Sequence, residues 1–382
     1  MVSFASRQKK FKEPSTRGDR RLAALRRFKR DSISLPHVPA KQPRCHLQIV
    51  FLVASAQDKM CGVADYTGRL ATALRDAGAS VTVEYLDSWS LRHIMEIRRH
   101  YAGRKDVVFH LQYPSLSIGK SVSPGFLPLA LPNIFVTLHE FRIFHILRKM
   151  VFLLPSLFAK AVIFSNDEEK TLFAHYFPWS HKRLAVVPIG NNIPRLATRK
   201  PSGGNERIVY FGQISRNKGI EFFIETIERL REGGSFAEVQ MIGALVETDA
   251  TFVDYVRGSA KRLGIELKLN LPPEAVSEAL SEATIALLPF PDGVSNKRGS
   301  ALACLDHGVC VLTTHTERTP EWLAEVTYPV TAPDDAVAMI GRIAHGEAAR
   351  TRSPQLLERE MAARDWHAIA GEHLRIYRQT VR

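Results

Sequence analysis

The stretch Thr284-Ile-Ala-Leu-Leu-Pro-Phe290 reads as a buried strand, and the polar loop after it ends in Ser295-Asn-Lys-Arg-Gly-Ser300. The apolar run at 301–305 follows directly, so the sequence predicts a strand, a loop and a helix. Lys297 and Arg298 stand where this helix begins. A helix N-terminus already has unpaired N–H groups and positive partial charge, so cations there are unfavourable unless an anion joins them. The junction therefore predicts an anion-binding site.

A second junction, earlier in the chain, has the same arrangement. The strand expected at 207–212 leads into Ser215-Arg-Asn-Lys-Gly219, and an amphipathic segment follows at 220–230. Either junction alone could be a solvated surface turn. Two cationic helix starts in one half of the chain favour a ligand that carries phosphate.

Apolar strands alternate with helical segments around these junctions and along most of the chain. The expected strands are 47–54, 79–86, 107–113, 134–138, 161–164, 184–189, 207–212, 238–242, 266–270, 284–290, 309–314 and 327–330, and helices are expected at 63–77, 144–154 and 167–176 among others. This alternation predicts parallel sheets covered on both faces, an α/β class with two doubly wound, Rossmann-like domains facing a cleft. Ligands of such sheets bind beyond the carboxyl ends of the strands, where both cationic turns fall.

The domain boundaries follow from composition. A segment rich in Pro, Gly and charge separates the two halves and is the expected linker. The expected parts are a basic arm at 1–44, an N-terminal domain at 45–194, the linker at 195–206, a C-terminal domain at 207–355 and a helical end at 356–382, interrupted near residues 364–366.

The net charge of +13 belongs mostly to the arm. Residues 1–44 hold 13 Lys and Arg against Glu13, Asp19 and Asp31, which gives +10 and leaves the rest of the chain at only about +3. Leu22, Leu25 and Phe28 lie among the cations of residues 20–30, a composition that suits an anionic membrane surface. Disorder of the free arm is the simplest alternative. Nucleic acid is disfavoured as a partner because the body is almost neutral and has no interleaved basic and aromatic face.

The remaining composition indicates a cytoplasmic chain that could lie peripherally on the inner face of a membrane. No apolar stretch is long enough to span a bilayer, and the N-terminus lacks the apolar core of a secretory signal. The four cysteines show no zinc spacing. No Asp-x-Asp pair stands ready to hold a divalent ion on a diphosphate, so neither a metal nor another cofactor is expected.

Five segments resemble, in order, motifs of the family 4-like glycosyltransferases (glycosyl transferases group 1), which have the GT-B fold. They are Cys61-Gly-Val-Ala-Asp-Tyr-Thr67, Val136-Thr-Leu-His-Glu-Phe141, Pro188-Ile-Gly-Asn-Asn-Ile193, Phe211-Gly-Gln-Ile-Ser-Arg-Asn-Lys-Gly219, and Leu288-Pro-Phe-Pro-Asp-Gly-Val-Ser295 with its continuation to Gly308. The resemblance covers nearly all of residues 46–380. It implies that the N-terminal domain binds the acceptor, that the C-terminal domain binds a nucleotide sugar, and that the helical end packs back toward the N-terminal domain.

Three positions depart from the common pattern of this family. Gln213 stands where the family has an Arg, and Ser295 and Ala303 stand where it has two glutamates separated by seven residues. A branch with the pattern Asp-Gly-x-Ser-x-x-Arg-Gly-Ser is the closer match. In that branch Asp292, Ser295, Arg298 and Ser300 are expected to contact donor atoms in a different way.

The site expectations combine the cationic junctions with this resemblance. Lys218 and Arg298 are expected to stabilise the charge that develops on a leaving diphosphate, and the resemblance places His139 beside the donor sugar, although a buried histidine can also be purely structural. Further donor-binding residues are expected at Gly62, Gly212, Arg216, Asp292, Gly293, Ser295, Lys297, Gly299 and Ser300. Asp65 and Glu140 are the candidate acceptor-binding residues. No metal ligand is expected.

The function that the resemblance implies is transfer of a sugar, of hexosyl type, from a nucleotide-sugar donor to a glycan or lipid-linked acceptor. The reaction would be retaining and independent of metal. The alternative is a non-catalytic GT-B scaffold that binds a sugar nucleotide or a partner protein. The segment 144–154 mixes cations with large apolar residues; membrane-associated relatives turn such a helix to lipid, but a buried helix between domains is the expectation here.

Overall fold

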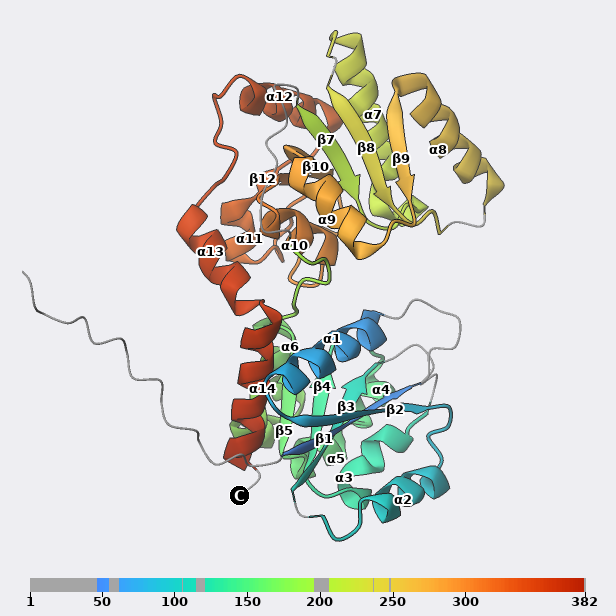
Figure 1. Ribbon diagram of the computed structural model, residues 1–382, viewed down its shortest axis with the longest axis vertical. Coiled ribbons are helices and arrows are strands. Elements are labelled where there is room, and N and C mark those ends of the chain that lie inside the picture. The colour runs from blue at the N-terminus through green and yellow to red at the C-terminus, as the bar shows by residue number, and fades with distance from the viewer. Residues whose placement is uncertain are drawn as a thin grey trace, which may run out of the picture. The chain divides into compact units, whose positions relative to one another are not determined.

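The computed structural model describes residues 47–54, 62–104, 106–114, 121–195, 206–235, 237–246 and 249–380. They form two six-stranded parallel sheets with helices against their faces (Figure 1), which confirms the α/β class with two doubly wound domains. The basic arm at 1–44 and most of the expected linker lie outside the described residues.

The first sheet has the order β2-β1-β3-β4-β5-β6, with every neighbouring pair parallel. Its central strands are buried and largely apolar because helices cover both faces. The strands are β1 (Gln48–Ala54), β2 (Ser80–Leu86), β3 (Val107–Tyr113), β4 (Ile134–Leu138), β5 (Ala161–Phe164) and β6 (Leu184–Val186).

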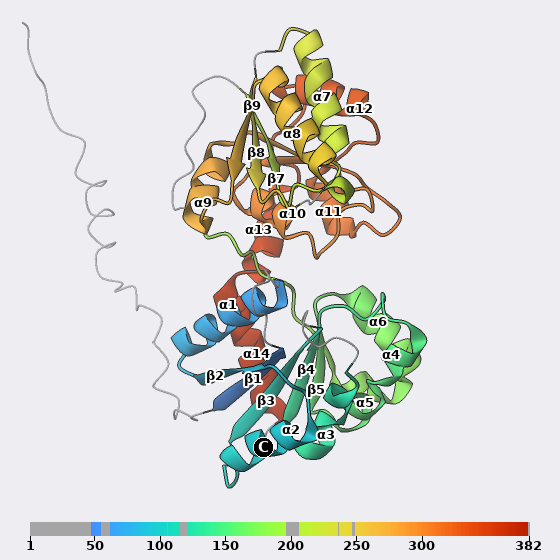
Figure 2. The ribbon, with the colours of Figure 1, turned by 90° about the vertical axis from the view of Figure 1, so that its right-hand side faces the viewer.

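Two distinct helical layers cover this sheet (Figure 2). On one face α1 (Gly62–Asp76) and α14 (Trp366–Thr380) share a core with the inward side chains of the strands. The opposite layer is built from shorter elements. They are α2 (Leu91–His100), η2 (Ser123–Phe126), α3 (Leu127–Ala130), α4 (Ile146–Met150), α5 (Leu153–Phe158), α6 (Asp167–Tyr176) and η3 (Pro178–Arg183).

The expectation of one buried helix at 144–154 is wrong. The segment is divided between α4 and α5, and several of its large apolar side chains and their neighbours are exposed, with Ile143 at 71% and Leu147 at 74% of full exposure. Hydrophobic pattern alone cannot distinguish an apolar face that packs inward from one that faces solvent.

The second sheet has the order β12-β11-β10-β7-β8-β9 and is also parallel. The strands are β7 (Arg207–Phe211), β8 (Glu238–Gly243), β9 (Ile265–Leu269), β10 (Ile285–Leu288), β11 (Cys310–Thr313) and β12 (Tyr328–Pro329). The helices are η4 (Arg216–Lys218), α7 (Ile220–Glu232), α8 (Ala250–Leu263), α9 (Pro273–Glu282), α10 (Gly299–Asp306), α11 (Glu321–Val326), α12 (Pro333–Ala344) and α13 (Pro354–Ala363). The order of strands reverses direction between β7 and β10, which is where a doubly wound sheet opens a crevice for a ligand.

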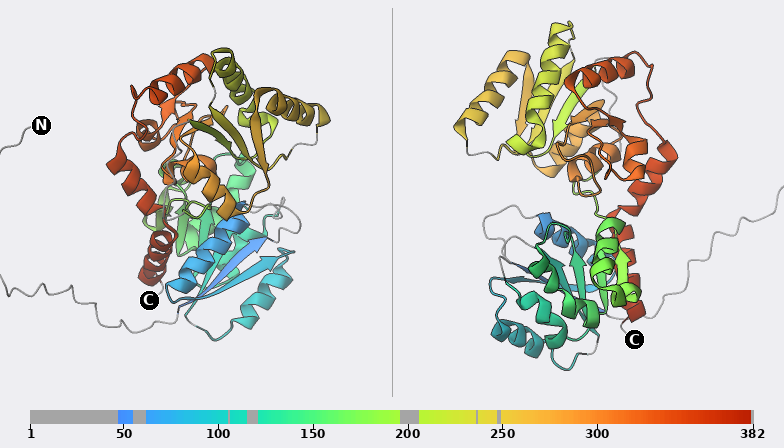
Figure 3. Two further views of the ribbon diagram at one scale, coloured as in Figure 1. Left: turned by 45° about the horizontal axis from the view of Figure 1, so that its top comes forward. Right: turned by 180° about the vertical axis from the view of Figure 1, so that it is seen from behind.

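The end of the chain returns to the first sheet. After α13, the chain turns through Arg364 and Asp365 and continues as α14 against α1 (Figure 3). Arg364 is held in this turn by Glu360 and by the ring of Trp322, whose centre lies 4.3 Å from the guanidinium carbon. Among the helices that the structure describes, none is both long and apolar enough to cross a membrane.

Candidate functional site

A cavity of about 400 Å³ opens where β7 and β10 end. Its position matches the crevice that the strand order of the second sheet provides. The lining residues come from the end of β7, the segments after β6, β7 and β10, and the start of α10: Asn191, Asn192, Ile193, Tyr210, Phe211, Gly212, Gln213, Lys218, Phe290, Lys297, Arg298, Gly299 and Ser300.

Gly219 fixes the turn that brings Lys218 to this cavity. Its φ of +74° lies in the left-handed region, and a Cβ atom would come within 2.0 Å of the Pro289 carbonyl oxygen. Only glycine therefore allows the turn before α7 to approach the end of β10 so closely. The carbonyl of Lys218 also accepts a 3.4 Å hydrogen bond from the Tyr210 hydroxyl.

The turn before α7 forms one wall of the cavity, and the start of α10 forms the other. Arg298 occupies the N-cap position, and Gly299 and Ser300 are the first two helical residues. A Cβ atom on Gly299 would meet nothing within 4 Å, so this side of the helix start is open. The N-terminal end of an eight-residue helix thus faces the cavity together with its cations.

Protein carboxylates already join three of the four junction cations. Arg298 pairs with Asp292 and lies over the Phe290 ring at 4.6 Å. Lys297 Nζ is 2.6 Å from Glu169 Oε1, and Arg216 pairs with Asp249. The premise that the junction cations need an external anion is therefore wrong for Lys297, Arg298 and Arg216. Lys218 has no carboxylate partner among the described residues.

The structure brings six of the predicted donor-site residues together and leaves others apart. Gly212, Lys218, Lys297, Arg298, Gly299 and Ser300 all line the cavity. Asp292 is linked to it only through Arg298, while Arg216 is turned toward Asp249 and Phe252. The Ser295 carbonyl accepts the Arg298 N–H at 3.0 Å. Gly293, at φ +82°, packs against Thr316 and shapes the loop.

His139 follows β4 and lies buried in a polar cluster of the first domain, with only 8% of it exposed. Its Nε2 donates to Gln112 Oε1 at 2.9 Å, and Tyr66 meets the ring edge-on. Burial, with added repulsion from Lys297 and His373, lowers the pKa of His139 to about 3. The imidazole is therefore neutral at physiological pH, and Lys297 lies close enough to affect its charge.

The candidate acceptor residues lie at the start of α1 and after β4. Asp65 is half exposed, 3.5 Å from Arg69 and hydrogen-bonded by the side chain of Asn192, which itself lines the cavity. Glu140 follows His139 and is partly buried. Gly62 is the first residue of α1, and the loop before it lies outside the described residues.

Three residues of the site were not predicted from the sequence to have a functional role: Glu169, Gln112 and Asn191. Glu169 is one of three consecutive acids at the start of α6, and its partners are 27 to 128 residues away in sequence. Such long-range pairing leaves no local signal. Asn191 belongs to the segment 188–193, whose family resemblance was the available clue.

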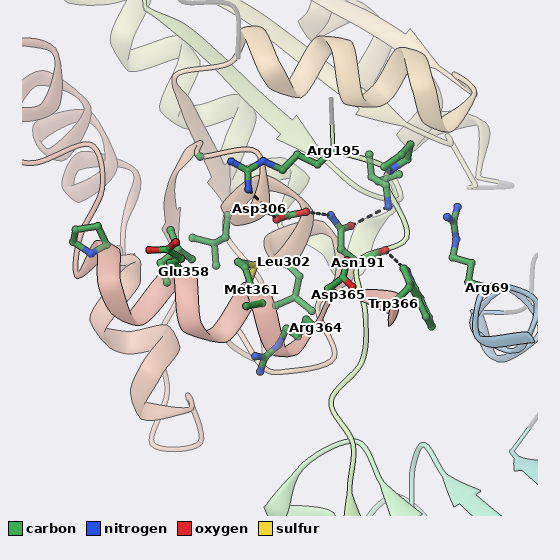
Figure 4. Close-up of a pocket in the computed structure, with 17 residues that line it drawn as sticks. Arg69, Asn191, Arg195, Leu302, Asp306, Glu358, Met361, Arg364, Asp365 and Trp366 are labelled. Atoms are coloured by element: carbon green, nitrogen blue, oxygen red, sulfur yellow. Dashed lines mark hydrogen bonds and ion pairs between the residues drawn. The ribbon is translucent and has the colours of Figure 1, made fainter. Parts of the chain in front are cut away.

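Asn191 also lines a second cavity, of about 720 Å³, beside the two places where the chain passes between the sheets (Figure 4). Its side chain donates to Asp306 Oδ2 at 2.9 Å, and its carbonyl accepts from Trp366 Nε1 at 2.7 Å. Arg195 reaches the same Asp306 at 3.9 Å. These contacts join α10, the start of α14 and the segment after β6 around one residue.

Within the part of the chain that the structure describes, no group of three or more His, Cys, Asp or Glu side chains is arranged to hold a metal ion. The polar groups of the first cavity are instead two ammonium groups, a guanidinium, hydroxyls and amides. This set is suited to an anionic ligand with several oxygen acceptors.

Comparison with known proteins gives a family match within the second domain. Residues 205–345 match the model for glycosyl transferases group 1. No curated protein matches the sequence as a relative. The matched segment contains β7 to β12 and both walls of the first cavity.

Solved structures share the fold at low sequence identity. A glycosyltransferase from Rickettsia africae ESF-5 aligns with a TM-score of 0.65 and 13% identity, over 88% of this chain and 98% of that one. Sucrose-phosphate synthase from Thermosynechococcus elongatus aligns at 0.62 and 16%, over 87% and 98%. Anabaena HepE, solved in complex with UDP and glucose, aligns at 0.57 and 13%, over 87% and 98%. The chain has a GT-B fold, and residues 205–345 of its second domain match the family model for glycosyl transferases group 1.

Proposed function

We propose that the protein transfers a sugar from a nucleotide-sugar donor to a glycan or lipid-linked acceptor. The observation that carries the proposal is the cavity at the ends of β7 and β10, where Lys218, Lys297 and Arg298 meet the N-terminal end of α10. HepE was solved with UDP and glucose, and starch synthase IV from Arabidopsis thaliana with ADP and acarbose. The proposed donor diphosphate in this cavity is of the same chemical class as the UDP and ADP in those two structures.

The proposed chemistry follows from where charge develops. Breaking the bond between sugar and diphosphate leaves added negative charge on the phosphate oxygens, and fixed cations and helix N–H groups stabilise it most effectively in a partly dry site. In the proposed retaining reaction the leaving phosphate assists removal of the acceptor proton. The cations take the place that a divalent metal ion would have, so the reaction is proposed to be independent of metal. Asp65 and Glu140 are the proposed acceptor contacts.

A non-catalytic scaffold that binds a sugar nucleotide is the second candidate. The observation that favours it is the environment of Ala303, which is fully buried in the core of the second domain and offers no carboxylate to the ligand. Ser295 likewise stands where the family has a glutamate. Both candidates predict donor binding, and only the enzyme consumes the donor.

The test is a thermal-shift screen of the full chain against UDP, GDP, ADP and their glucose or mannose conjugates. A ligand at 100 times its dissociation constant raises stability by about 2.7 kcal/mol. We expect at least one nucleoside diphosphate to do so. Release of nucleoside diphosphate from the bound donor then separates the enzyme from the scaffold, and the absence of any shift across the panel would contradict both candidates.

His139 provides a test of the sugar side of the site. The His139→Asn variant keeps an N–H donor toward Gln112, whereas His139→Ala leaves the buried Gln112 oxygen unpaired, at a cost of about 1–3 kcal/mol. If His139 contacts the donor sugar, we expect His139→Asn to lower turnover by roughly tenfold or more while the melting temperature changes by only a few degrees. Normal turnover with a large fall in melting temperature would instead make the histidine structural.

The membrane proposal has two parts, the basic arm and a folded apolar surface. Eleven of the fourteen exposed large apolar side chains in the described part of the chain lie on or beside α2, η2, α3, α4, α5 and η3. The same elements contain seven Lys and Arg residues against one Glu. Apolar groups among cations favour an anionic lipid surface, so we propose peripheral attachment at the cytoplasmic face of a membrane through this layer and the arm.

We expect the full chain to sediment with vesicles of phosphatidylglycerol and phosphatidylcholine. A chain that begins at Lys41 should lose much of this binding, since each cation near such a surface contributes about 1 kcal/mol before salt screening. Ile143→Glu with Leu147→Glu should weaken it independently. Val246→Glu and Tyr255→Glu on the second domain are the matched controls, with exposures of 48% and 41%. Equal sedimentation of all these proteins would contradict the proposal, and nucleoside diphosphate affinity should be unchanged throughout.

A further inference from the structure

Glu169 is a buried carboxylate with no part in the proposed chemistry. It is the third residue of α6, and only 4% of it is exposed. The two acids before it are exposed to solvent, where Asp167 pairs with Lys170 and Glu168 pairs with Arg142. A buried carboxylate is costly unless it is paired and hydrogen-bonded, so its contacts are informative.

The two oxygens of Glu169 contact different parts of the chain. Oε2 accepts the backbone N–H groups of Phe141 and Arg142, both at 2.9 Å, and so holds the segment that directly follows His139 and Glu140. Oε1 lies 2.6 Å from Lys297 Nζ in the loop before α10. One carboxylate therefore joins the β4 end of the first domain to a wall of the donor cavity in the second.

Lys297 is the cavity residue that this contact affects. Its side chain is 28% exposed and lines the cavity beside Arg298, so its ammonium can reach a ligand there. The first turn of α6 and the two N–H groups keep Glu169 satisfied as an anion even without Lys297. Lys297 can consequently move away from Glu169, or bind a ligand while still contacting it, without leaving the buried carboxylate unpaired.

We propose that Glu169 is a positioning residue that acts through Lys297: it holds the ammonium group in the empty cavity and yields it to phosphate oxygens when a nucleoside diphosphate binds. The inference rests on the proposed function, because it assumes that a diphosphate occupies this cavity. On this proposal Glu169 competes with the ligand for Lys297. The carboxylate also repels the anionic ligand.

Glu169→Gln isolates the charge from the fold. The glutamine amide oxygen can accept both N–H groups of residues 141 and 142, while its NH₂ group cannot pair with Lys297. We expect this variant to bind nucleoside diphosphate roughly 3 to 30 times more tightly than the wild type, because the Lys297 ammonium is then free to form a charge-assisted hydrogen bond with phosphate. A purely structural role could lower the affinity or leave it unchanged, but would not raise it in a way that depends on Lys297.

The experiment is calorimetric titration of the full-length proteins with UDP, GDP and ADP. Glu168→Gln is the matched control, one residue earlier and exposed, and should leave the affinity unchanged. Lys297→Gln should weaken binding, and combining it with Glu169→Gln should not restore the affinity. A double-mutant cycle of this kind reports the coupling between the two side chains directly.

The outcomes separate this inference from the proposed function. If the wild type binds none of the three diphosphates, the proposed function fails and the inference fails with it. If the wild type binds but Glu169→Gln does not tighten binding, or tightens it equally in the Lys297→Gln background, Glu169 does not act through Lys297. Should Glu169→Gln fail to fold, Lys297→Gln alone decides: its loss of affinity must be smaller than that of Lys218→Ala, since Lys297 is already paired in the empty protein.

Discussion

Lys218→Ala should reduce the affinity for the best-binding nucleoside diphosphate by roughly 10- to 150-fold, or about 1.5–3 kcal/mol. Lys218 lines the cavity, and no carboxylate among the described residues competes for its ammonium. Its full charge is thus available to the phosphates, and its removal breaks no ion pair within the part of the chain that the structure describes. The melting temperature without ligand should accordingly stay the same or rise slightly, because a cation near a helix start is removed.

The matched control is Arg216→Ala, two residues earlier in the same turn. Its guanidinium pairs with Asp249 and lies over the Phe252 ring, outside the cavity lining. We expect a small change in affinity for this variant, measured by the same calorimetric titration. Equal losses in both variants would show a general effect of charge rather than a bound phosphate, and an unchanged affinity in Lys218→Ala would show that the site is misplaced.

Arg298 should behave differently from Lys218, which revises the simple expectation that both are uncompensated in the empty protein. Its guanidinium pairs with Asp292 and packs on Phe290. Arg298→Ala should therefore weaken diphosphate binding and also destabilise the unliganded protein. Proximity to a helix N-terminus alone would predict the same effect on stability for both variants.

Most of the fold could be predicted from the sequence because buried parallel strands are largely apolar. The segments 107–113, 134–138 and 161–164 coincide with β3, β4 and β5. The helix α2 was not predicted because its apolar stripe is narrow: only Ile94 and Ile97 are buried among its many cations. The segment 184–189 forms a strand only to Val186, after which the chain turns toward the cavity.

The first cavity could be predicted to the extent that it depends on local pattern. A glycine-containing cationic turn after a strand is visible in sequence, and Lys218, Arg298 and Ser300 were found in this way. The carboxylate partners were not, because Asp249, Glu169 and Asp292 carry no local sign of what they contact. Unpaired cations and internally paired cations therefore look alike in sequence, and only tertiary contacts distinguish Lys218 from its neighbours.

Acid should unfold this protein more readily than its surface charges would suggest, because three buried histidines of the first domain stay neutral when folded. His110 bonds Tyr377 Oη at 2.5 Å and Thr137 Oγ1 at 2.8 Å, and burial lowers its pKa well below the usual value. Burial also lowers the pKa of His373 to about 4, and that of His139 to about 3 with further repulsion from Lys297.

The direction in which the free energy of unfolding changes with pH follows from proton uptake by the unfolded chain. Below the unfolded pKa of about 6.5 the unfolded chain binds protons at these histidines while the folded chain does not, so the free energy of unfolding falls as pH falls. The loss begins near pH 6.5 and continues until the folded pKa values, about 3 for His139 and about 4 for His373, are reached. Between about pH 7.5 and pH 5 each histidine should contribute about 2 kcal/mol of destabilisation.

Urea unfolding at about pH 7.5, 6 and 5 measures this effect, and His373→Leu identifies its source. His373 Nδ1 bonds the Ile369 carbonyl at 2.9 Å, so its Nε2 is the unprotonated nitrogen, buried and without a partner among the described residues. Protonation would place a positive charge on this nitrogen, and no acceptor among the described residues would pair with its N–H group. We expect His373→Leu to reduce the loss over this pH range by about 2 kcal/mol. The same pH dependence in the wild type and in His373→Leu would mean that His373 does not contribute to the sensitivity of the fold to acid.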